Sequence, residues 1–209
     1  MNYLDTFKLT GKVAFITGGS RGLGLEISEA LREAGAKVAL MARREAYFAE
    51  ALLSIPDALC IIGDVSSEDD VKRAVAECEA KLGTVDILVN AAGISWGAPA
   101  IEMPAEKFRQ VMQVNVDGSF YAAKAVAPGM IKKGYGKIIN IASIAGIKGE
   151  PADVLDAVGY SSSKAAVIGM TRDLANKWGP MGIRVNAIAP GFFPTKMTEK
   201  VIPKITEQL

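Results

Sequence analysis

The sequence contains no histidine, and this absence excludes several classes of catalytic site. Without an imidazole, the chain cannot assemble a Ser-His-Asp or Cys-His nucleophile, an HExxH metalloprotease site or a histidine general base. Cysteine is scarce as well, since Cys60 and Cys78 lie far apart and lack the histidines that usually complete a zinc site. We therefore expect no metal site and interpret both cysteines as small buried hydrophobic residues in a reducing compartment.

The sequence also lacks an excess of charge of either sign. Its 24 lysines and arginines are offset by 23 aspartates and glutamates, for a formal net charge of +1, which provides no electrostatic surface for nucleic acid or an anionic membrane. No apolar run approaches the roughly 18 residues of a membrane span, and the N-terminal MNYLDTFKLTGK has no apolar signal region. We therefore expect a cytoplasmic protein that binds neither nucleic acid nor membrane.

The pattern that is present is a regular alternation of strands and helices. The 209 residues, half of them apolar, suffice for one sizeable core. No repeat, charge block or linker divides the chain, so we expect a single domain over residues 1–209. Short β-rich runs, several of them continuously apolar, predict strands at residues 13–17, 37–42, 59–62, 87–90, 137–141 and 184–188.

Helical patterns fill the intervals between these strands. Apolar residues recur with helical spacing over residues 23–34 and 71–82, and a glycine that can end a helix follows each stretch. Ser66 and Ser67 are candidate N-caps for the second stretch. Strand and helix alternating through right-handed crossovers predict a doubly wound parallel sheet, a Rossmann-like α/β fold, with its ligand at the carboxyl ends of the strands.

A glycine-rich turn follows the first strand and opens directly into a helix. Glycine allows unusual backbone angles and close approach of a ligand, and the helix N-terminus offers N–H groups and a positive dipole end to a pyrophosphate. A tight turn without a ligand is the alternative. The spacing, G-x-x-x-G-x-G, differs from the commoner G-x-G-x-x-G. The turn comprises Thr17, Gly18, Gly19, Ser20, Arg21, Gly22, Leu23 and Gly24.

Three further segments occur in the order and strand context of one known family. The fourth strand ends in Asn-Ala-Ala-Gly at residues 90–93, Ser143 follows the fifth, and the next helix carries Tyr160 and Lys164, while Asn115 lies in the stretch QVNV. Together with the glycine turn, these segments resemble the short-chain dehydrogenase/reductase family over roughly residues 10–198. The chain is similar to 3-oxoacyl-acyl-carrier-protein reductases and gluconate 5-dehydrogenases within it.

The tyrosine and lysine suit acid–base chemistry that needs no histidine. Tyr160 and Lys164 are four residues apart and so share a helix face. Because a nearby cation favours the phenolate, we expect Lys164 to lower the pKa of Tyr160, and we expect Ser143 to orient a substrate carbonyl. The resemblance implies that Tyr160 is the acid in ketone reduction and the base in alcohol oxidation. It also implies that Asn115 supports a proton relay and that the cofactor carries the hydride.

Cations after the second strand favour NADP(H) over NAD. An NAD site usually has an acid there for the ribose 2′-hydroxyl, whereas this chain has Arg43 and Arg44, with Arg21 in the glycine turn. Solvated surface arginines are the alternative. The resemblance implies the cofactor-binding residues Gly18, Ser20, Arg21, Gly22, Leu23, Gly24, Arg43, Arg44, Asp64, Val65, Asn90, Ala91, Gly93, Tyr160, Lys164, Pro190, Gly191 and Thr195. Asp64 resembles the acceptor for the adenine amine, and its alternative is an aspartate that begins a helix.

Two features depart from the family pattern. Residues 150–158 look like an insertion, which we expect to reshape the substrate mouth, with a tolerated surface loop as the alternative. The 209 residues stop before the family's substrate-covering segment and final strand, so we expect a sheet without that strand. The small residues Ala165, Ala166 and Gly169 suit close helix contact in a homo-oligomer, a dimer or tetramer.

The implied substrate is a ketone or secondary alcohol. We expect reduction of a 3-oxoacyl thioester, with a sugar-acid or polyol dehydrogenase and an inactive dinucleotide-binding scaffold as alternatives. We expect an apolar cleft with cations for an anionic group, and packing or solvent exposure is the alternative for each lining residue. The candidates are Ile94, Trp96, Ile144, Phe192, Phe193 and Met197, with Lys148 and Lys196 as the cations.

Overall fold

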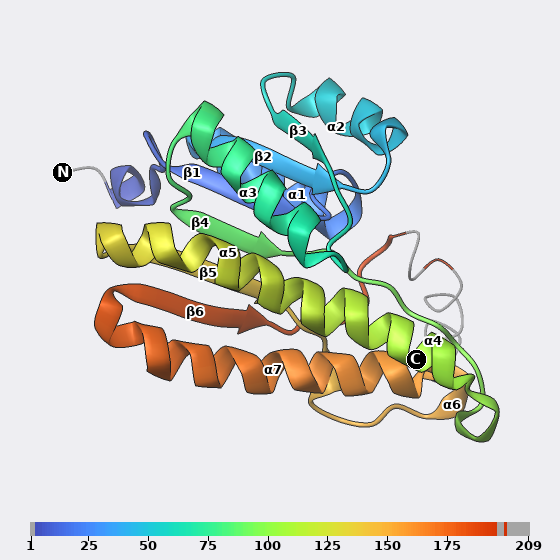
Figure 1. Cartoon of the computed structure of the whole chain (residues 1–209). Coiled ribbons are helices and arrows are strands. Elements are labelled where there is room, and N and C mark those ends of the chain that lie inside the picture. Colours follow the sequence, from blue (N-terminus) through green and yellow to red (C-terminus); the bar gives the residue numbers. More distant parts are fainter. Residues whose placement is uncertain (1–2, 196–198, 200–209) are drawn as a thin grey trace.

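Among the described residues, six parallel strands form one sheet in the order β3-β2-β1-β4-β5-β6. This computed structural model describes residues 3–195 and residue 199 (Figure 1). The prediction of a doubly wound sheet is confirmed, and β5 and β6 each begin one residue earlier than expected. The strands are β1 (Val13–Thr17), β2 (Lys37–Ala42), β3 (Leu59–Ile62), β4 (Ile87–Asn90), β5 (Gly136–Ile141) and β6 (Ile183–Ile188).

Helices cover both faces of this sheet. Figure 1 shows α3, α5 and α7 side by side over one face, with α1 behind the sheet. Residues of α1 and α2 belong to the buried cluster on that second face. The helices are α1 (Gly22–Glu33), α2 (Phe48–Ser54), α3 (Glu68–Leu82), α4 (Ala105–Met112), α5 (Gly118–Lys133), α6 (Ala152–Leu155) and α7 (Val158–Trp178). Among the described residues, none of the helices combines the length and apolar character needed to cross a membrane.

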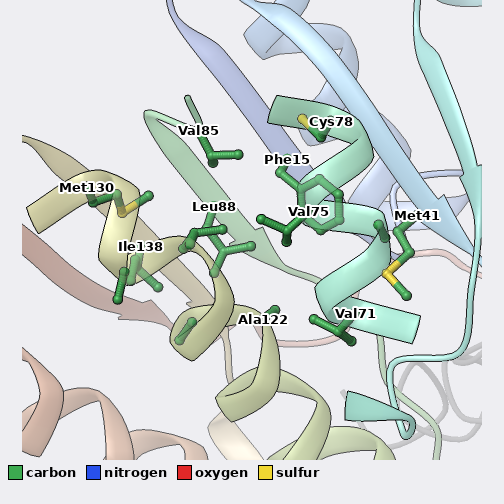
Figure 2. Packing of buried hydrophobic residues seen from close by; sticks show 14 of the residues in the cluster. Phe15, Met41, Val71, Val75, Cys78, Val85, Leu88, Ala122, Met130 and Ile138 are labelled. Carbon is green, nitrogen blue, oxygen red and sulfur yellow. The ribbon is translucent and has the colours of Figure 1, made fainter. Parts of the chain in front are cut away.

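The strands are continuously apolar because helices cover both faces of the sheet. Adjacent residues of a strand point to opposite faces, so Phe15 packs in the cluster under α3 and α5 while Ile16 packs in the cluster under α1 and α2. Figure 2 shows Phe15 and Leu88 from the strands against Val75 of α3 and Ala122 of α5. Burial on both faces holds the central strands rigidly, which fixes the positions of the loops that leave their ends.

The predicted beginning of α3 is confirmed in detail. Ser67 is the N-cap, and its hydroxyl accepts a hydrogen bond of 3.2 Å from the backbone N–H of Asp70. Glu68, Asp69 and Asp70 place negative charge in the first turn, where the helix dipole favours it. Gly83, with φ +104°, ends the helix as expected.

A buried carboxylate anchors the opposite end of the sheet, where the strands begin. Asp86 is 1% exposed, and its Oδ2 accepts a hydrogen bond of 3.1 Å from the backbone N–H of Val13. Its Oδ1 lies 2.6 Å from Nζ of Lys133 and 3.7 Å from Nζ of Lys12. This carboxylate therefore joins the starts of β1 and β4 to the last turn of α5.

We predict that Asp86→Ala lowers the free energy of unfolding by about 2 to 3 kcal/mol, because it leaves the buried N–H of Val13 without its acceptor. Chemical denaturation measures this loss. Asp173→Ala is the matched control: Asp173 forms an exposed ion pair with Lys177 one helical turn away, and removing it should cost only about 0.5 kcal/mol. Equal losses in the two variants would refute the anchoring role.

Candidate active site

A cleft of about 1320 Å³ lies where the carboxyl ends of the strands meet. Its lining comes from the glycine turn, the segments that follow β2, β3, β4 and β5, residues 152–157, α7 and residues 190–195. This volume exceeds the roughly 300 to 1,000 Å³ of common small-molecule sites, so the cleft has room for a large ligand. The predicted site residues in the lining are Gly18, Ser20, Arg21, Gly22, Leu23, Gly24, Arg43, Asp64, Val65, Ala91, Gly93, Ser143, Tyr160, Lys164, Pro190, Gly191 and Thr195.

The glycine turn packs closely against the segment after β4. Gly18 adopts φ +68°, and a Cβ there would lie 2.7 Å from Cα of Ala92 in the segment after β4. The helix α1 begins at Gly22, and the N-cap residue Arg21 makes no side-chain capping hydrogen bond. The first N–H groups of α1 therefore present a positive dipole end to the cleft, which fits a pyrophosphate.

Basic side chains gather at the end of the cleft beside β2. The guanidinium of Arg21 lies 4.4 Å from the ring centroid of Tyr47, and that of Arg44 lies 5.6 Å from the same centroid. Nη1 of Arg43 lies 3.8 Å from Oδ2 of Asp64. Arg44 does not line the cleft directly, whereas Tyr47 does. The sequence analysis missed Tyr47, which has no motif of its own.

Asp64 lines the cleft and also forms hydrogen bonds in the turn that precedes α3. Its Oδ1 accepts hydrogen bonds from the backbone N–H of Ser66 at 2.9 Å and from the hydroxyl of Ser66 at 2.7 Å. These bonds form a local turn just before α3. Asp64 therefore forms the turn into α3 with one carboxylate oxygen and also lines the cleft, and its role toward the adenine amine stays a prediction.

The serine and tyrosine predicted as a catalytic pair meet across the cleft. Ser143 follows β5 and Tyr160 lies in the first turns of α7, and their hydroxyls form a hydrogen bond. Gly146 permits this approach, because a Cβ there would lie 2.6 Å from the backbone carbon of Lys164. Ser143 also accepts a hydrogen bond of 3.2 Å from the backbone N–H of Ala145, which limits its rotation.

Lys164 is buried beneath the tyrosine. Its Nζ donates a hydrogen bond of 2.6 Å to the carbonyl oxygen of Ile141 and lies 5.5 Å from the Tyr160 ring centroid. Burial lowers the pKa of Lys164 to about 8. Burial also raises the pKa of Tyr160, and the hydrogen bond with Ser143 opposes that rise. The expectation that Lys164 lowers the phenol pKa is therefore wrong for the chain alone, where burial removes the phenolate from water and raises this pKa, and Ser143 is the group that opposes the rise.

Asn115 lies behind the cleft rather than in its lining. It occupies a π-helical segment, Gln113–Asp117, between α4 and α5, a distortion common near functional sites. Its Oδ1 accepts a hydrogen bond of 2.9 Å from the Ile94 N–H, and its Nδ2 donates to the Ile94 carbonyl at 3.0 Å. Nδ2 also donates to Oγ of Ser163 at 2.9 Å, and that hydroxyl donates to the Tyr160 carbonyl at 2.7 Å. Asn115 thus ties the loop after β4 to the helix that carries Tyr160.

The side chain of Asn90, a predicted cofactor contact, lies in the protein interior. It is 2% exposed and does not line the cleft. Its Nδ2 donates to Oδ1 of Asn140 at 2.8 Å and to the carbonyl of Ser119 at 3.1 Å. Its side chain therefore joins β4, β5 and α5 beneath the site.

The apparent insertion forms one wall of the cleft. Residues 152–157 line it, and the backbone N–H of Ala98 donates a hydrogen bond of 2.9 Å to the carbonyl of Asp156. Both Asp153 and Asp156 belong to this wall. The segment therefore lines the cleft, and its role toward the substrate stays a prediction.

The expected substrate lining is present only in part. Ile94, Ile144, Phe192 and Phe193 line the cleft. Trp96 does not: it is 43% exposed, and Nζ of Lys107 lies 4.8 Å from its ring.

The two expected cations of the substrate end do not appear in the described lining. Lys148 is outside it, and its Nζ lies 3.3 Å from Oε1 of Glu150. Lys196 and Met197 lie outside the described residues.

Comparison with known proteins identifies the family. The short chain dehydrogenase family model matches residues 12–206. The chain belongs to this family of oxidoreductases. It is 41% identical to galactitol 2-dehydrogenase (L-tagatose-forming) of Cereibacter sphaeroides, over 96% of this chain and 79% of that enzyme. It is 36% identical to the 3-oxoacyl-[acyl-carrier-protein] reductase of Synechocystis sp., over 92% of this chain and 78% of that enzyme.

Solved structures of other short-chain dehydrogenases have the same fold. A gluconate 5-dehydrogenase from Burkholderia cenocepacia, in complex with NADP and tartrate, is 36% identical with a TM-score of 0.89, covering 96% of this chain and 79% of that one. An NAD⁺-bound xylitol dehydrogenase is 36% identical with a TM-score of 0.87, covering 92% and 75%. This short-chain dehydrogenase is therefore an enzyme of a family that binds nicotinamide dinucleotides.

The buried ammonium predicts an unusual dependence of stability on pH. Because the pKa of Lys164 falls from 10.5 to about 8 on folding, the unfolded chain binds more protons between these values, and stability rises with pH across that window. Relative to Lys164→Met, the wild-type free energy of unfolding should increase by about 2.5 kcal/mol between about pH 7 and 10. Denaturation of both proteins at each pH measures this difference. A pH-independent difference would show that Lys164 titrates normally.

Proposed function

We propose that this enzyme transfers hydride between NADP(H) and a secondary alcohol or ketone, with Tyr160 as the acid–base residue. The observation that carries the proposal is the meeting of Ser143, Tyr160 and Lys164 in one cleft with the glycine turn. A protein that only binds a nucleotide has no need of a buried ammonium beneath a serine–tyrosine pair. When bound, the dinucleotide supplies or accepts the hydride, and its oxidised ring carries a positive charge.

Tyr160, Ser143 and Lys164 have separate roles in the proton transfer. Because its pKa is raised, Tyr160 stays protonated at neutral pH, which is the form that donates a proton to a ketone oxygen during reduction. Ser143 donates a second hydrogen bond to that oxygen and orients it. Lys164 provides a nearby positive charge that stabilises the phenolate left behind. Asn115 supports proton exchange by holding the loop after β4 beside Lys164.

Three arginines support NADP(H) as the cofactor. Arg21 and Arg43 line the cleft beside β2, and Arg44 lies over Tyr47 next to them. A guanidinium recognises a phosphate through paired hydrogen bonds, whereas a 2′-hydroxyl has no charge for it to neutralise. The ion pair of Arg43 with Asp64 is long, at 3.8 Å, and both side chains are solvated, so it competes weakly with a phosphate.

For the substrate, the described part of the cleft favours a neutral polyhydroxy compound. The cations in the lining are Arg21 and Arg43 at the nucleotide end and Lys164, whose ammonium is bonded to a backbone carbonyl. The lining also includes Asp153 and Asp156, from residues 152–157. Carboxylates repel an anionic substrate and accept hydrogen bonds from hydroxyl groups. The 3-oxoacyl thioester remains a second candidate, because apolar side chains, among them Ile144 and Phe192, line the same cleft.

A substrate panel tests this choice. The wild-type enzyme is assayed by nicotinamide absorbance with galactitol and xylitol as neutral polyols, gluconate as a sugar acid, and a 3-oxoacyl thioester in the reverse direction. We predict that kcat/KM for a neutral polyol exceeds that for gluconate by about tenfold or more, as a repulsion of roughly 1 to 2 kcal/mol implies. Preference for the thioester would favour the second candidate. Cofactor binding without turnover on any compound would instead indicate a scaffold.

We predict that Tyr160→Phe reduces turnover by about 10³-fold, because the variant has no proton to donate. The Kd for NADPH should change by less than about twofold. Tyr135→Phe is the matched control and should retain full activity, since Tyr135 packs against Lys12 far along the sheet from the cleft. Turnover of Tyr160→Phe close to wild type would remove the phenol from the mechanism.

We predict that Arg43→Ala weakens NADPH binding by about tenfold while NADH binding changes little, because only NADPH carries the 2′-phosphate. Titration of each variant with the two reduced dinucleotides measures the Kd values. Arg32→Ala removes an exposed arginine that pairs with Asp57, outside the cleft lining, and should affect neither. Equal weakening of NADPH and NADH by Arg43→Ala would contradict the cofactor assignment.

We also propose that the enzyme assembles as a homo-oligomer through α7. Ala165 and Gly169 are exposed on this helix, and a Cβ at Gly169 would meet no atom within 4 Å among the described residues. A second helix can therefore approach this face closely.

A further inference from the structure

Tyr47 occupies a central place at the basic end of the cleft. It ends the short 3-10 turn Glu45–Tyr47 that follows β2, and its backbone N–H donates a hydrogen bond of 3.1 Å to the carbonyl of Arg44. Its ring is half-buried and packs against the hydrophobic cluster under α1 and α2. The ring is therefore held by the core on one side while it lines the cleft on the other.

Two guanidinium groups from different segments meet this one ring. Arg21 comes from the turn after β1, and its guanidinium lies 4.4 Å from the ring centroid, while that of Arg44 lies at 5.6 Å. Both distances are within the range of a cation–π contact. Without the ring, the two like charges would repel each other, and both flexible side chains would keep their rotamer freedom in solvent.

We infer that Tyr47 is a positioning residue that holds Arg21 and Arg44 ready for the 2′-phosphate and so contributes to selection of NADP(H) over NAD(H). The inference rests on the proposed cofactor. The guanidinium of Arg43 instead lies 3.8 Å from Asp64, and no contact with the Tyr47 ring is seen among the described residues, so removing that ring disturbs two of the three cations. NADH has no 2′-phosphate for these cations to bind, so its affinity does not depend on how they are positioned.

The Kd values of NADPH and NADH for Tyr47 variants test this role. Tyr47→Leu removes the π face but keeps an apolar side chain, and we expect NADPH binding to weaken about fivefold or more while NADH binding stays within about twofold. Tyr47→Phe is the matched control, because it keeps the ring, and it should bind both dinucleotides nearly as the wild type does. If Tyr47→Leu loses stability in thermal unfolding, Tyr47→Met provides the same comparison.

A double-mutant cycle with Arg21→Ala tests the contact itself. If the ring acts by holding Arg21, the effects of Tyr47→Leu and Arg21→Ala on the NADPH Kd combine to less than the product of the single effects. Equal losses for NADPH and NADH, full additivity in the cycle, or Tyr47→Phe as impaired as Tyr47→Leu would overturn the inference. A wild-type enzyme without preference for NADPH would contradict the cofactor proposal itself. A clear preference that Tyr47→Leu leaves intact would contradict only the role of Tyr47.

Discussion

The hydrogen bond of 2.6 Å from the ammonium of Lys164 to the carbonyl oxygen of Ile141 is the contact on which the site depends. It joins α7 to the end of β5. The position of Tyr160 on that helix is therefore fixed relative to Ser143, which follows that strand. Gly146 lets the turn after β5 lie directly on the backbone at Lys164. An ionisable group is thus buried at a cost in stability, with its nitrogen 5.5 Å from the ring centroid of Tyr160.

Buried polar side chains beneath this contact form hydrogen bonds that link the same strand and helix. Asn90 donates to Asn140, and Asn140 in turn donates a hydrogen bond of 2.9 Å to the hydroxyl of Thr171 on α7. Strands β4 and β5 and helix α7 are therefore linked by side-chain hydrogen bonds within an apolar core. Such bonds have fixed geometry, whereas apolar contacts tolerate sliding. The network accordingly restricts movement of the elements that carry Asn115, Ser143 and Tyr160.

The sequence was informative where local chemistry decides the outcome. Strand positions followed from apolar runs covered on both faces, and the start of α3 from the capping serine Ser67. The glycine turn and the Tyr160–Lys164 spacing located the cleft because both lie next to strand ends. These features depend on neighbours in the chain, so periodicity and spacing reveal them.

Features that depend on distant partners were missed or misread. The pKa of Tyr160 depends on how deeply the fold buries it, which no spacing reports. Lys148 looked available for a substrate anion, but Glu150 pairs with it. The ring of Tyr47 acquires its two arginines only when the turns after β1 and β2 come together. In each case the property of the side chain depends on contacts with residues distant in the sequence.

The state of the buried ammonium is the most direct test of this account. Nuclear magnetic resonance of the protein with ¹⁵N-labelled lysine side chains follows each Nζ through a pH titration, and the signal of Lys164 is assigned by its loss in Lys164→Arg. We predict that Lys164 titrates near pH 8, because burial lowers its pKa to about that value. Titration of Lys164 above about pH 10, the ordinary range of a solvated lysine, would contradict this prediction.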